Sequence, residues 1–285
     1  MYNTGGCSTA YNSLPLHLES SKFPTVGPQA LNLSTRAQVG TGDQALIGGF
    51  IVTGTNPKTV VLRALGPSLG DAGVTGALPD PKLSVFNSTG HLIASNDNWQ
   101  TDASAEVIVS EGLAPTDPLE AAASLTLQPG AYTVVVNGQD DTTGVALLEA
   151  YDLSAESGSI LANISARGVV GSNDDVLIAG FIIGDVESTT VVARALGPSL
   201  PATNVGQPLS DPLLSVYDSN GLEIGTNNNW QDDPSSGDVA RDGLAPTDAN
   251  ESALLLNLPA GGYSAIVRGA DGGTGVALVE IYNLQ

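Results

Sequence analysis

Two long segments of this chain repeat each other, and this repetition constrains the fold more than any other feature of the sequence. Residues 31–153 and 162–284 align without a gap at an offset of 131 positions. The segment RALGPSL occurs at 63–69 and 194–200, GLAPTD at 112–117 and 243–248, and TGVAL at 143–147 and 274–278. Self-similarity at one fixed period indicates two copies of one folding unit. Each copy is long enough to be a domain with its own core.

The rest of the chain flanks these two copies. We expect an N-terminal extension (1–30) with a strand-like segment at 13–20, a first repeat (31–153), a linker (154–161) and a second repeat (162–285).

Within each repeat the local signals are those of strands. Short apolar and β-branched runs, such as TVVLRAL and AYTVVV, are bounded by clusters of Gly, Pro, Asn and Asp. About eight such runs fit in each copy, and one short helix is expected at 103–110. The pattern predicts an all-β chain of two tandem β-sandwich domains, jelly-roll-like or immunoglobulin-like in build.

The charge of the chain excludes several classes of partner. Nine Lys and Arg stand against thirty Asp and Glu, which gives a formal charge of −21. Such a surface repels nucleic-acid backbones and anionic lipids, and it attracts divalent cations. No apolar run reaches the 18 residues that a membrane-spanning helix needs, so we expect no membrane insertion. We expect a secreted protein, extracellular or at the cell surface, whose leader has been removed.

Half of each repeat resembles a known family. The segments LLSVYDSNGLEIGTNNNW (213–230) and LPAGGYSAIV (258–267), with their counterparts at 83–99 and 127–136, are similar to the bacterial pre-peptidase C-terminal type β-sandwich. The whole unit also resembles an uncharacterised tandem module of secreted bacterial proteins. The resemblance implies an extracellular accessory or structural domain that in some members binds calcium.

Two oxygen-rich loops are candidate calcium sites. Ca²⁺ takes six to eight oxygen ligands, and the loops at 95–102 and 226–233 crowd Asn and Asp side chains at short spacing. The alternative is that these side chains cap turns through local hydrogen bonds. The candidate ligands, with the acids that follow each loop, are Asn96, Asp97, Asn98, Asp102, Asp117 and Glu120, then Asn229, Asp233, Asp248 and Glu251.

Two arginines interrupt apolar strands. A guanidinium buried in a strand needs a partner, and we expect Arg63 to pair with Glu149 and Arg194 with Glu280. Each repeat also has one tryptophan, Trp99 or Trp230, which either closes the end of a core or stacks on a sugar. In a chain so poor in aromatic residues we favour the core.

The sequence offers no catalytic set. The two histidines are His17, in the extension, and His91, whose counterpart at 222 is Leu, so the repeats share no Ser-His-Asp set. Neither a phosphate-binding glycine loop nor an H-E-x-x-H motif occurs. We therefore expect a protein that is not an enzyme.

The segment SLPLHLES (13–20) belongs to neither repeat. Its Leu14, Leu16 and Leu18 alternate with other residues, which is the period of a strand. Such a segment either docks on its own chain or completes a sheet of the next subunit, as a donor strand. We expect the second, and hence a structural filament or surface-layer subunit whose partner is itself. The alternative is a non-catalytic accessory module that binds carbohydrate or protein.

Overall fold

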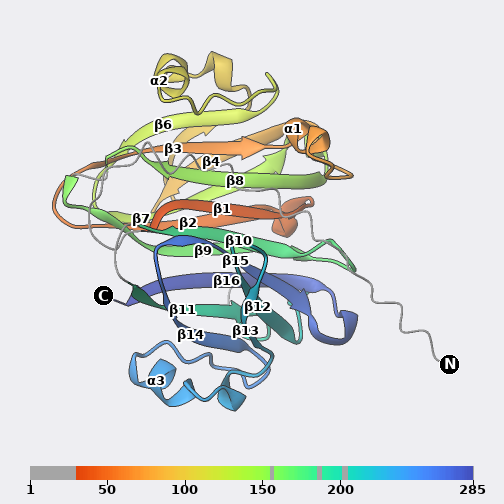
Figure 1. The fold of residues 1–285 in the computed structure, drawn as a ribbon. Helices are drawn as coiled ribbons and strands as arrows, with labels where there is room; N and C mark the ends of the chain where they lie inside the picture. Colours follow the sequence, from red (N-terminus) through yellow and green to blue (C-terminus); the bar gives the residue numbers. More distant parts are fainter. Residues whose placement is uncertain (1–29, 155–156, 185–187, 201–204, 285) are drawn as a thin grey trace.

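The computed structural model describes residues 30–154, 157–184, 188–200 and 205–284. The segment with Leu14, Leu16 and Leu18 therefore lies outside the described residues. The described chain consists of strands with a few short helices, so the predicted all-β class is confirmed (Figure 1). None of the described helices is long and apolar enough to cross a membrane.

The strands of the two repeats correspond one to one and follow in the same order. The first contributes β1 (Ala30–Val39), β2 (Leu46–Thr53), β3 (Lys58–Leu65), β4 (Pro81–Asn87), β5 (Leu92–Asn96), β6 (Ala121–Leu127), β7 (Gly130–Gly138) and β8 (Gly144–Asp152). The second contributes β9 (Ile160–Val170), β10 (Leu177–Ile183), β11 (Thr189–Leu196), β12 (Pro212–Asp218), β13 (Glu223–Asn227), β14 (Ser252–Leu258), β15 (Gly261–Gly269) and β16 (Gly275–Leu284). Strands β2 to β8 begin 131 residues before β10 to β16.

The helices are short and lie in the connections. They are α1 (Pro67–Asp71), α2 (Ala105–Ser110) and α3 (Ser236–Arg241), with the 3₁₀ turns η2 (Gly42–Gln44), η3 (Trp99–Thr101), η4 (Gln139–Asp141), η7 (Trp230–Asp232) and η8 (Ala270–Gly272). Helix α2 is the short helix expected at 103–110. Its Ile108 is buried against Val61 and Ala122, so α2 covers the outer side of β3 and β6.

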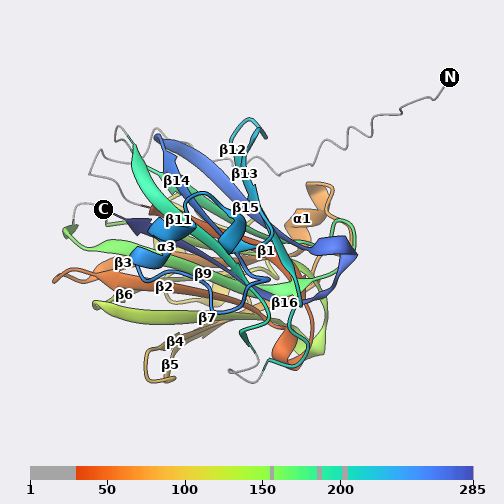
Figure 2. The same cartoon turned by 90° about the horizontal axis from the view of Figure 1, so that it is seen from below.

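The strands pair in two antiparallel paths, each of which runs through both repeats. One path is β6-β3-β8-β1-β10-β15-β12-β13, and the other is β14-β11-β16-β9-β2-β7-β4-β5. A single register position, Gln38 opposite Val169, links them. Seen from below, the strands of the second repeat run obliquely across those of the first, as the twist of β-sheets requires (Figure 2).

The repeats exchange partners at their first two strands. Strand β1 pairs with β10 and β9 pairs with β2, so that Arg36 lies opposite Ile178 and its counterpart Arg167 lies opposite Ile47. Glycine makes the approach possible, because a Cβ on Gly49 would lie 2.4 Å from Oγ of Ser165. Both contacts have the same register, as expected of two units related by a twofold axis.

The apolar core is shared as well. The sequence predicts a core for each repeat, whereas the largest cluster of buried apolar side chains draws on both. Leu33 and Ala37 of β1 belong to it together with Ile164 and Ala166 of β9. The reason is the exchanged pairing, which places the inward faces of β1 and β9 between the two halves. The division at 154–161 remains a prediction; β8 ends at Asp152 and β9 begins at Ile160.

Candidate functional site

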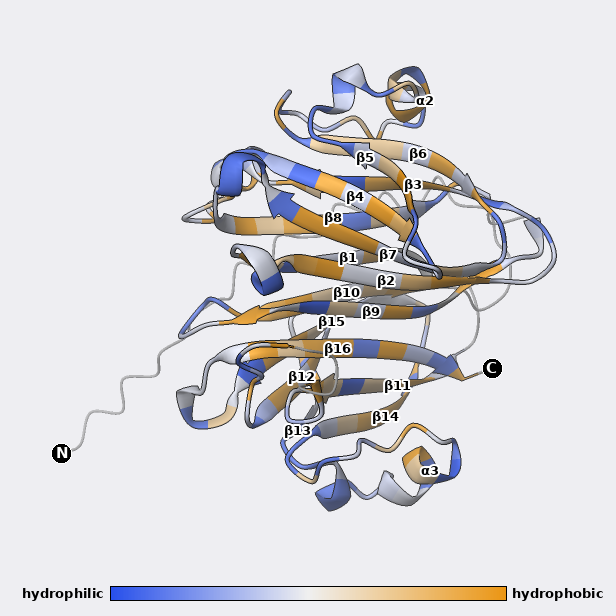
Figure 3. Ribbon diagram, turned by 180° about the vertical axis from the view of Figure 1, so that it is seen from behind, coloured by the Kyte–Doolittle hydropathy of each residue, from blue (hydrophilic) through white to orange (hydrophobic). Residues whose placement is uncertain are grey.

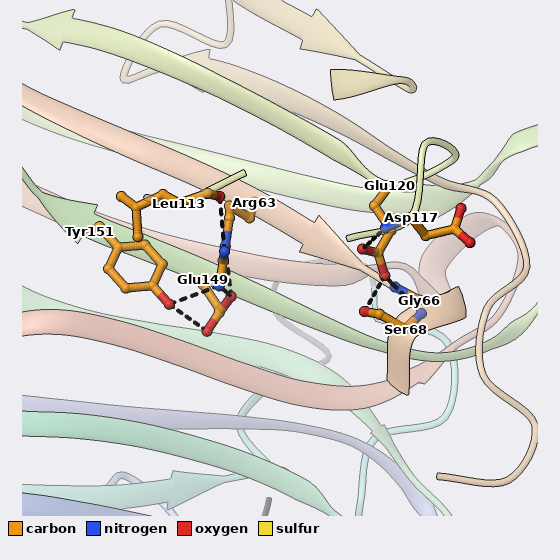
Figure 4. A network of polar contacts seen from close by, with 8 residues as sticks. All are labelled: Arg63, Gly66, Ser68, Leu113, Asp117, Glu120, Glu149 and Tyr151. Atoms are coloured by element: carbon orange, nitrogen blue, oxygen red, sulfur yellow. Dashed lines mark hydrogen bonds and ion pairs between the residues drawn. The ribbon is translucent and has the colours of Figure 1, made fainter. Parts of the chain in front are cut away.

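The predicted partners of Arg63 come together on neighbouring strands of the first repeat. Arg63 on β3 lies opposite Glu149 on β8. Its Nε and Nη2 donate to Glu149 Oε2 at 3.0 and 2.5 Å, and its Nη1 donates to the carbonyl of Leu113 at 2.9 Å. The hydroxyl of Tyr151 accepts from Nη2 at 2.9 Å and donates to Glu149 Oε1 at 2.8 Å (Figure 4).

The electrostatics of this cluster hold the arginine charged. Burial alone lowers the pKa of Arg63, but the charge of Glu149, the hydrogen bond to it and the neighbouring Tyr151 and Glu120 together outweigh burial, so that the pKa is raised. The cluster recurs in the second repeat. Arg194 donates to Glu280 through Nε at 3.1 Å and through Nη2, and its Nη1 donates to Leu244 O at 2.7 Å. In both repeats the arginine binds a glutamate and a tyrosine of the neighbouring strand and a carbonyl of a nearby loop. The cluster therefore holds strands of its own repeat together.

Glu120 is fully buried and holds the loop that contains the GPS sequence. Its Oε1 accepts hydrogen bonds from the main-chain N–H groups of Gly66 and Ser68 at 2.9 and 3.0 Å, and from Ser68 Oγ at 2.5 Å (Figure 4). Its counterpart Glu251 accepts from Gly197 and Ser199 in the same way.

These contacts explain why RALGPSL and the acid after GLAPTD repeat together. The sequence reasoning assigned Glu120 and Glu251 to metal and missed this role. The signal that points to it is the fixed spacing of both motifs in the two repeats.

Among the candidate calcium ligands of the first repeat, the side chains of Asn96, Asp102 and Asp117 bind the main chain or a local side chain. Asn96 Oδ1 accepts from the N–H of Ala122 at 3.0 Å, and its Nδ2 donates to Asn98 O. Asp102 Oδ1 accepts from N and Oγ of Ser104 at 2.8 and 2.6 Å, and Asp117 Oδ1 accepts from Leu119 N at 2.9 Å.

The same pattern recurs in the second repeat. Asn229 O accepts from Asn227 Nδ2, Asp233 Oδ1 accepts from Ser235 N and Asp248 Oδ1 accepts from Asn250 N. Within the described ranges, no three His, Cys, Asp or Glu side chains gather where they can share a metal ion. The geometry therefore favours turn capping over metal binding in these loops.

The two tryptophans lie beside the small apolar clusters under α2 and α3. Trp99 packs against the cluster of Val61, Ile108 and Ala122, and its Nε1 donates to Asp117 O at 3.2 Å. Trp230 packs equivalently in the second repeat. Both rings are partly buried against apolar side chains of their own repeat, which agrees with the core position that we favoured over sugar stacking.

Asp80 and Asp211, which the sequence analysis did not select, lie where the ionised form of the carboxyl group is disfavoured. Burial raises the pKa of Asp80, and the nearby charges of Asp97 and Asp140 raise it further. Burial and the charge of Asp271 raise the pKa of Asp211, its counterpart. Among the described residues, neither Oδ1 atom has a hydrogen-bond partner.

A buried ion pair distinguishes the two repeats. Lys58 Nζ lies 2.5 Å from Asp152 Oδ2, and both side chains are completely buried. Nζ also donates to Ser154 O at 3.2 Å, and Asp152 Oδ1 accepts from Ser154 N at 2.9 Å. The second repeat has an uncharged pair here, in which Thr189 Oγ1 donates to Asn283 Oδ1 at 2.8 Å.

The sheets end in four strands, β5, β6, β13 and β14. On β6 the main-chain N–H groups of Ala122 and Ser124 donate to Asn96 Oδ1 and to Ser104 Oγ, the latter at 2.8 Å. On β14 the N–H of Ala253 donates to Asn227 Oδ1 at 3.1 Å. Side chains thus occupy donors that an added strand would need. Strands β5 and β13, of five residues each, are the other two ends.

Comparisons with known proteins add little to this geometry. No family model and no curated protein matches the chain, so the resemblance to the pre-peptidase C-terminal type domain stays a prediction. Among solved structures, a DUF4785 family protein from Legionella pneumophila is 8% identical with a TM-score of 0.23, over 94% of this chain and 86% of that one. The STIV MCP is 10% identical with a TM-score of 0.24, over 92% and 89%. Likenesses this weak say nothing about function.

Proposed function

We propose that this protein is a structural, extracellular subunit of a filament or surface layer. In this proposal two β-sandwich units with interlinked sheets form its body, and the N-terminal arm with Leu14, Leu16 and Leu18 adds as a strand to a neighbouring subunit. The assembly needs no cofactor and no nucleic acid, and its partner is a second copy of the same chain.

The observation that carries the proposal is that the polar side chains repeated in both halves bind other parts of their own repeat. Arg63 lies in one of the motifs that both halves repeat, and Glu120 and Glu149 follow two others; their side chains bind strands and loops of their own repeat. Conserving such clusters in both repeats preserves a rigid body, which is the requirement of a building block. Residues of a catalytic or ligand site would instead direct polar groups toward solvent or a cavity.

The energetics of the arm support strand addition over side-chain docking alone. Burying three leucines contributes roughly 5–9 kcal/mol, whereas ordering eight residues costs on the order of 8–16 kcal/mol of backbone entropy. A ladder of main-chain hydrogen bonds, each worth about 0.5–1.5 kcal/mol, covers the difference. Pro15 lacks an N–H group, which suits a strand at a sheet edge.

Negative-stain electron microscopy of the purified full chain tests the proposal. We expect fibres or sheets from the wild type, and their loss in Leu16→Asp. His17→Asp is the matched control, because it adds the same charge on the other side of an extended segment and should leave assembly intact. Monodisperse monomers at every concentration would contradict the proposal, and retention on a polysaccharide column would then favour the binding module.

A further inference from the structure

The exposed apolar side chains of the described chain are concentrated in one segment. Seven large apolar residues are more than a third exposed, and five of them lie between the first residue of β5 and the start of β6. We term these five residues, which lie on β5, on α2 and just before β6, the repeat 1 end face: Leu92 (47% exposed), Ile93 (38%), Val107 (43%), Val109 (55%) and Leu119 (44%). Figures 1 and 3 show that this segment, with α2, makes up one end of the molecule, and that α3 lies at the other.

The second repeat has polar residues at three of the same five positions and a smaller apolar residue at a fourth. The counterparts of the five residues are Glu223, Ile224, Asp238, Ala240 and Asn250. The buried residue between them is apolar in both repeats, Ile108 in one and Val239 in the other. Stability of the fold acts equally on both copies, so it accounts for the buried residue and leaves the exposed ones unexplained. Large apolar residues that are exposed at all five positions in only one of two copies indicate a binding surface.

The main chain at this end can accept one strand. The N–H groups of Ala122 and Ser124 on β6 are already bonded to side chains. Strand β5 pairs with β4 on one side only, and within the described ranges no strand pairs with its other side. An unpaired edge next to exposed apolar residues is the arrangement that strand addition uses.

Charge favours the arm of a second copy as the occupant. The 29 residues before β1 contain one Glu and one Lys, so the formal charge of −21 belongs to residues 30–285. Two such bodies repel each other, whereas the arm of a second copy approaches without that cost. Its three alternating leucines match an apolar surface beside a strand edge.

We propose that residues 13–18 of a second copy add to the free side of β5 and pack their leucines on the repeat 1 end face. This inference rests on the proposed function and specifies its acceptor. Each subunit then has one donor arm and one acceptor, in the first repeat, and such a head-to-tail contact does not close on itself.

The test uses the full chain and a labelled peptide of residues 10–22. The acceptor variant combines Val107→Asp with Leu119→Asn, the residues that the second repeat already has in the same fold. Leu222→Asp is the control, because Leu222 is 64% exposed in the second repeat and lies outside the end face. We measure peptide binding by fluorescence anisotropy and assembly by electron microscopy. Circular dichroism melting confirms that each variant is folded.

We expect the acceptor variant to bind the peptide about tenfold or more weakly and to form no fibres, and the control to behave as the wild type. Fibres and peptide binding that persist in the acceptor variant would overturn this inference and leave the proposed function standing. Peptide binding that the acceptor variant loses, in a protein that never forms fibres, would support the acceptor and overturn the filament instead. Failure of the wild type to bind the peptide would overturn the acceptor.

Discussion

Ala37 and Gly168 hold the same position in the two repeats and face each other where β1 and β9 meet. A Cβ added to Gly168 would lie 2.7 Å from the Cβ of Ala37, a distance at which two carbon atoms overlap. The next residue along each strand repeats the relationship, because Gln38 lies opposite its own counterpart Val169. A position that meets its counterpart lies on the twofold axis of an isologous contact. The two repeats are therefore related as the halves of a symmetric dimer are.

We predict that Gly168→Ala lowers the free energy of unfolding by about 1–3 kcal/mol, because it overpacks the contact on this axis. Ala37→Gly added to the same chain should recover most of the loss, since it returns one methyl group to the pair. Urea denaturation of the wild type, the two single variants and the double variant measures both effects. Equal stability of Gly168→Ala and the double variant would contradict this account of the contact.

The sequence predicted the strands of each repeat far better than the contact between the repeats. Alternating apolar residues and turn signals mark β2, β3 and β7 without knowledge of the rest of the chain. The exchange of β1 and β9 leaves no such mark, because both copies present the same pattern to either partner. One trace of the contact is visible in the sequence: Gly168 aligns with Ala37. A glycine is needed in one copy there, because two methyl groups would overlap.

Part of the candidate site could likewise be predicted from the sequence, and part could not. Arg63 and Glu149 were predictable as partners, since a charge inside an apolar strand requires an opposite charge nearby. The role of Glu120 was not, because its partners are main-chain N–H groups that no side-chain pattern records. Asn96 was taken for a metal ligand, although its amide joins the ends of the two sheets at Ala122.

We predict that calcium leaves the melting temperature unchanged, because Oδ1 of Asp102, Oδ1 of Asp117 and Oε1 of Glu120 already accept hydrogen bonds within the fold. A ligand that binds only the folded state raises the melting temperature, so thermal melts in EDTA and in millimolar CaCl₂ check this directly. MgCl₂ at equal ionic strength controls for screening of the net charge. A rise specific to calcium that disappears in Asp97→Asn would restore the metal site.

Asp80→Asn should stabilise the protein at pH 7. Burial and the nearby charges of Asp97 and Asp140 raise the pKa of Asp80 in the folded state. A raised carboxyl pKa means that the folded state binds the proton more tightly, so stability falls as the pH rises through the folded value and the penalty persists above it. The gain from Asp80→Asn is therefore present at pH 7 and disappears below the unfolded pKa, and salt reduces it.

Melting temperatures at pH 7 and pH 3 check this dependence. Asp71→Asn, at an exposed position, removes one charge from the same net total and serves as the control. An equal gain from both variants would assign the effect to net charge and contradict the local account.

The buried pair of Lys58 and Asp152 tests whether the uncharged pair of the second repeat can replace an ion pair in the first. Removing one partner leaves a lone charge in the core, so Lys58→Thr or Asp152→Asn alone should cost about 3–5 kcal/mol. The double variant places in the first repeat the uncharged pair that Thr189 and Asn283 form in the second. Because neutral pairs often replace buried ion pairs without loss, it should recover most of that cost. Chemical denaturation of all four proteins completes the cycle, and strictly additive losses would show that the two side chains are not coupled.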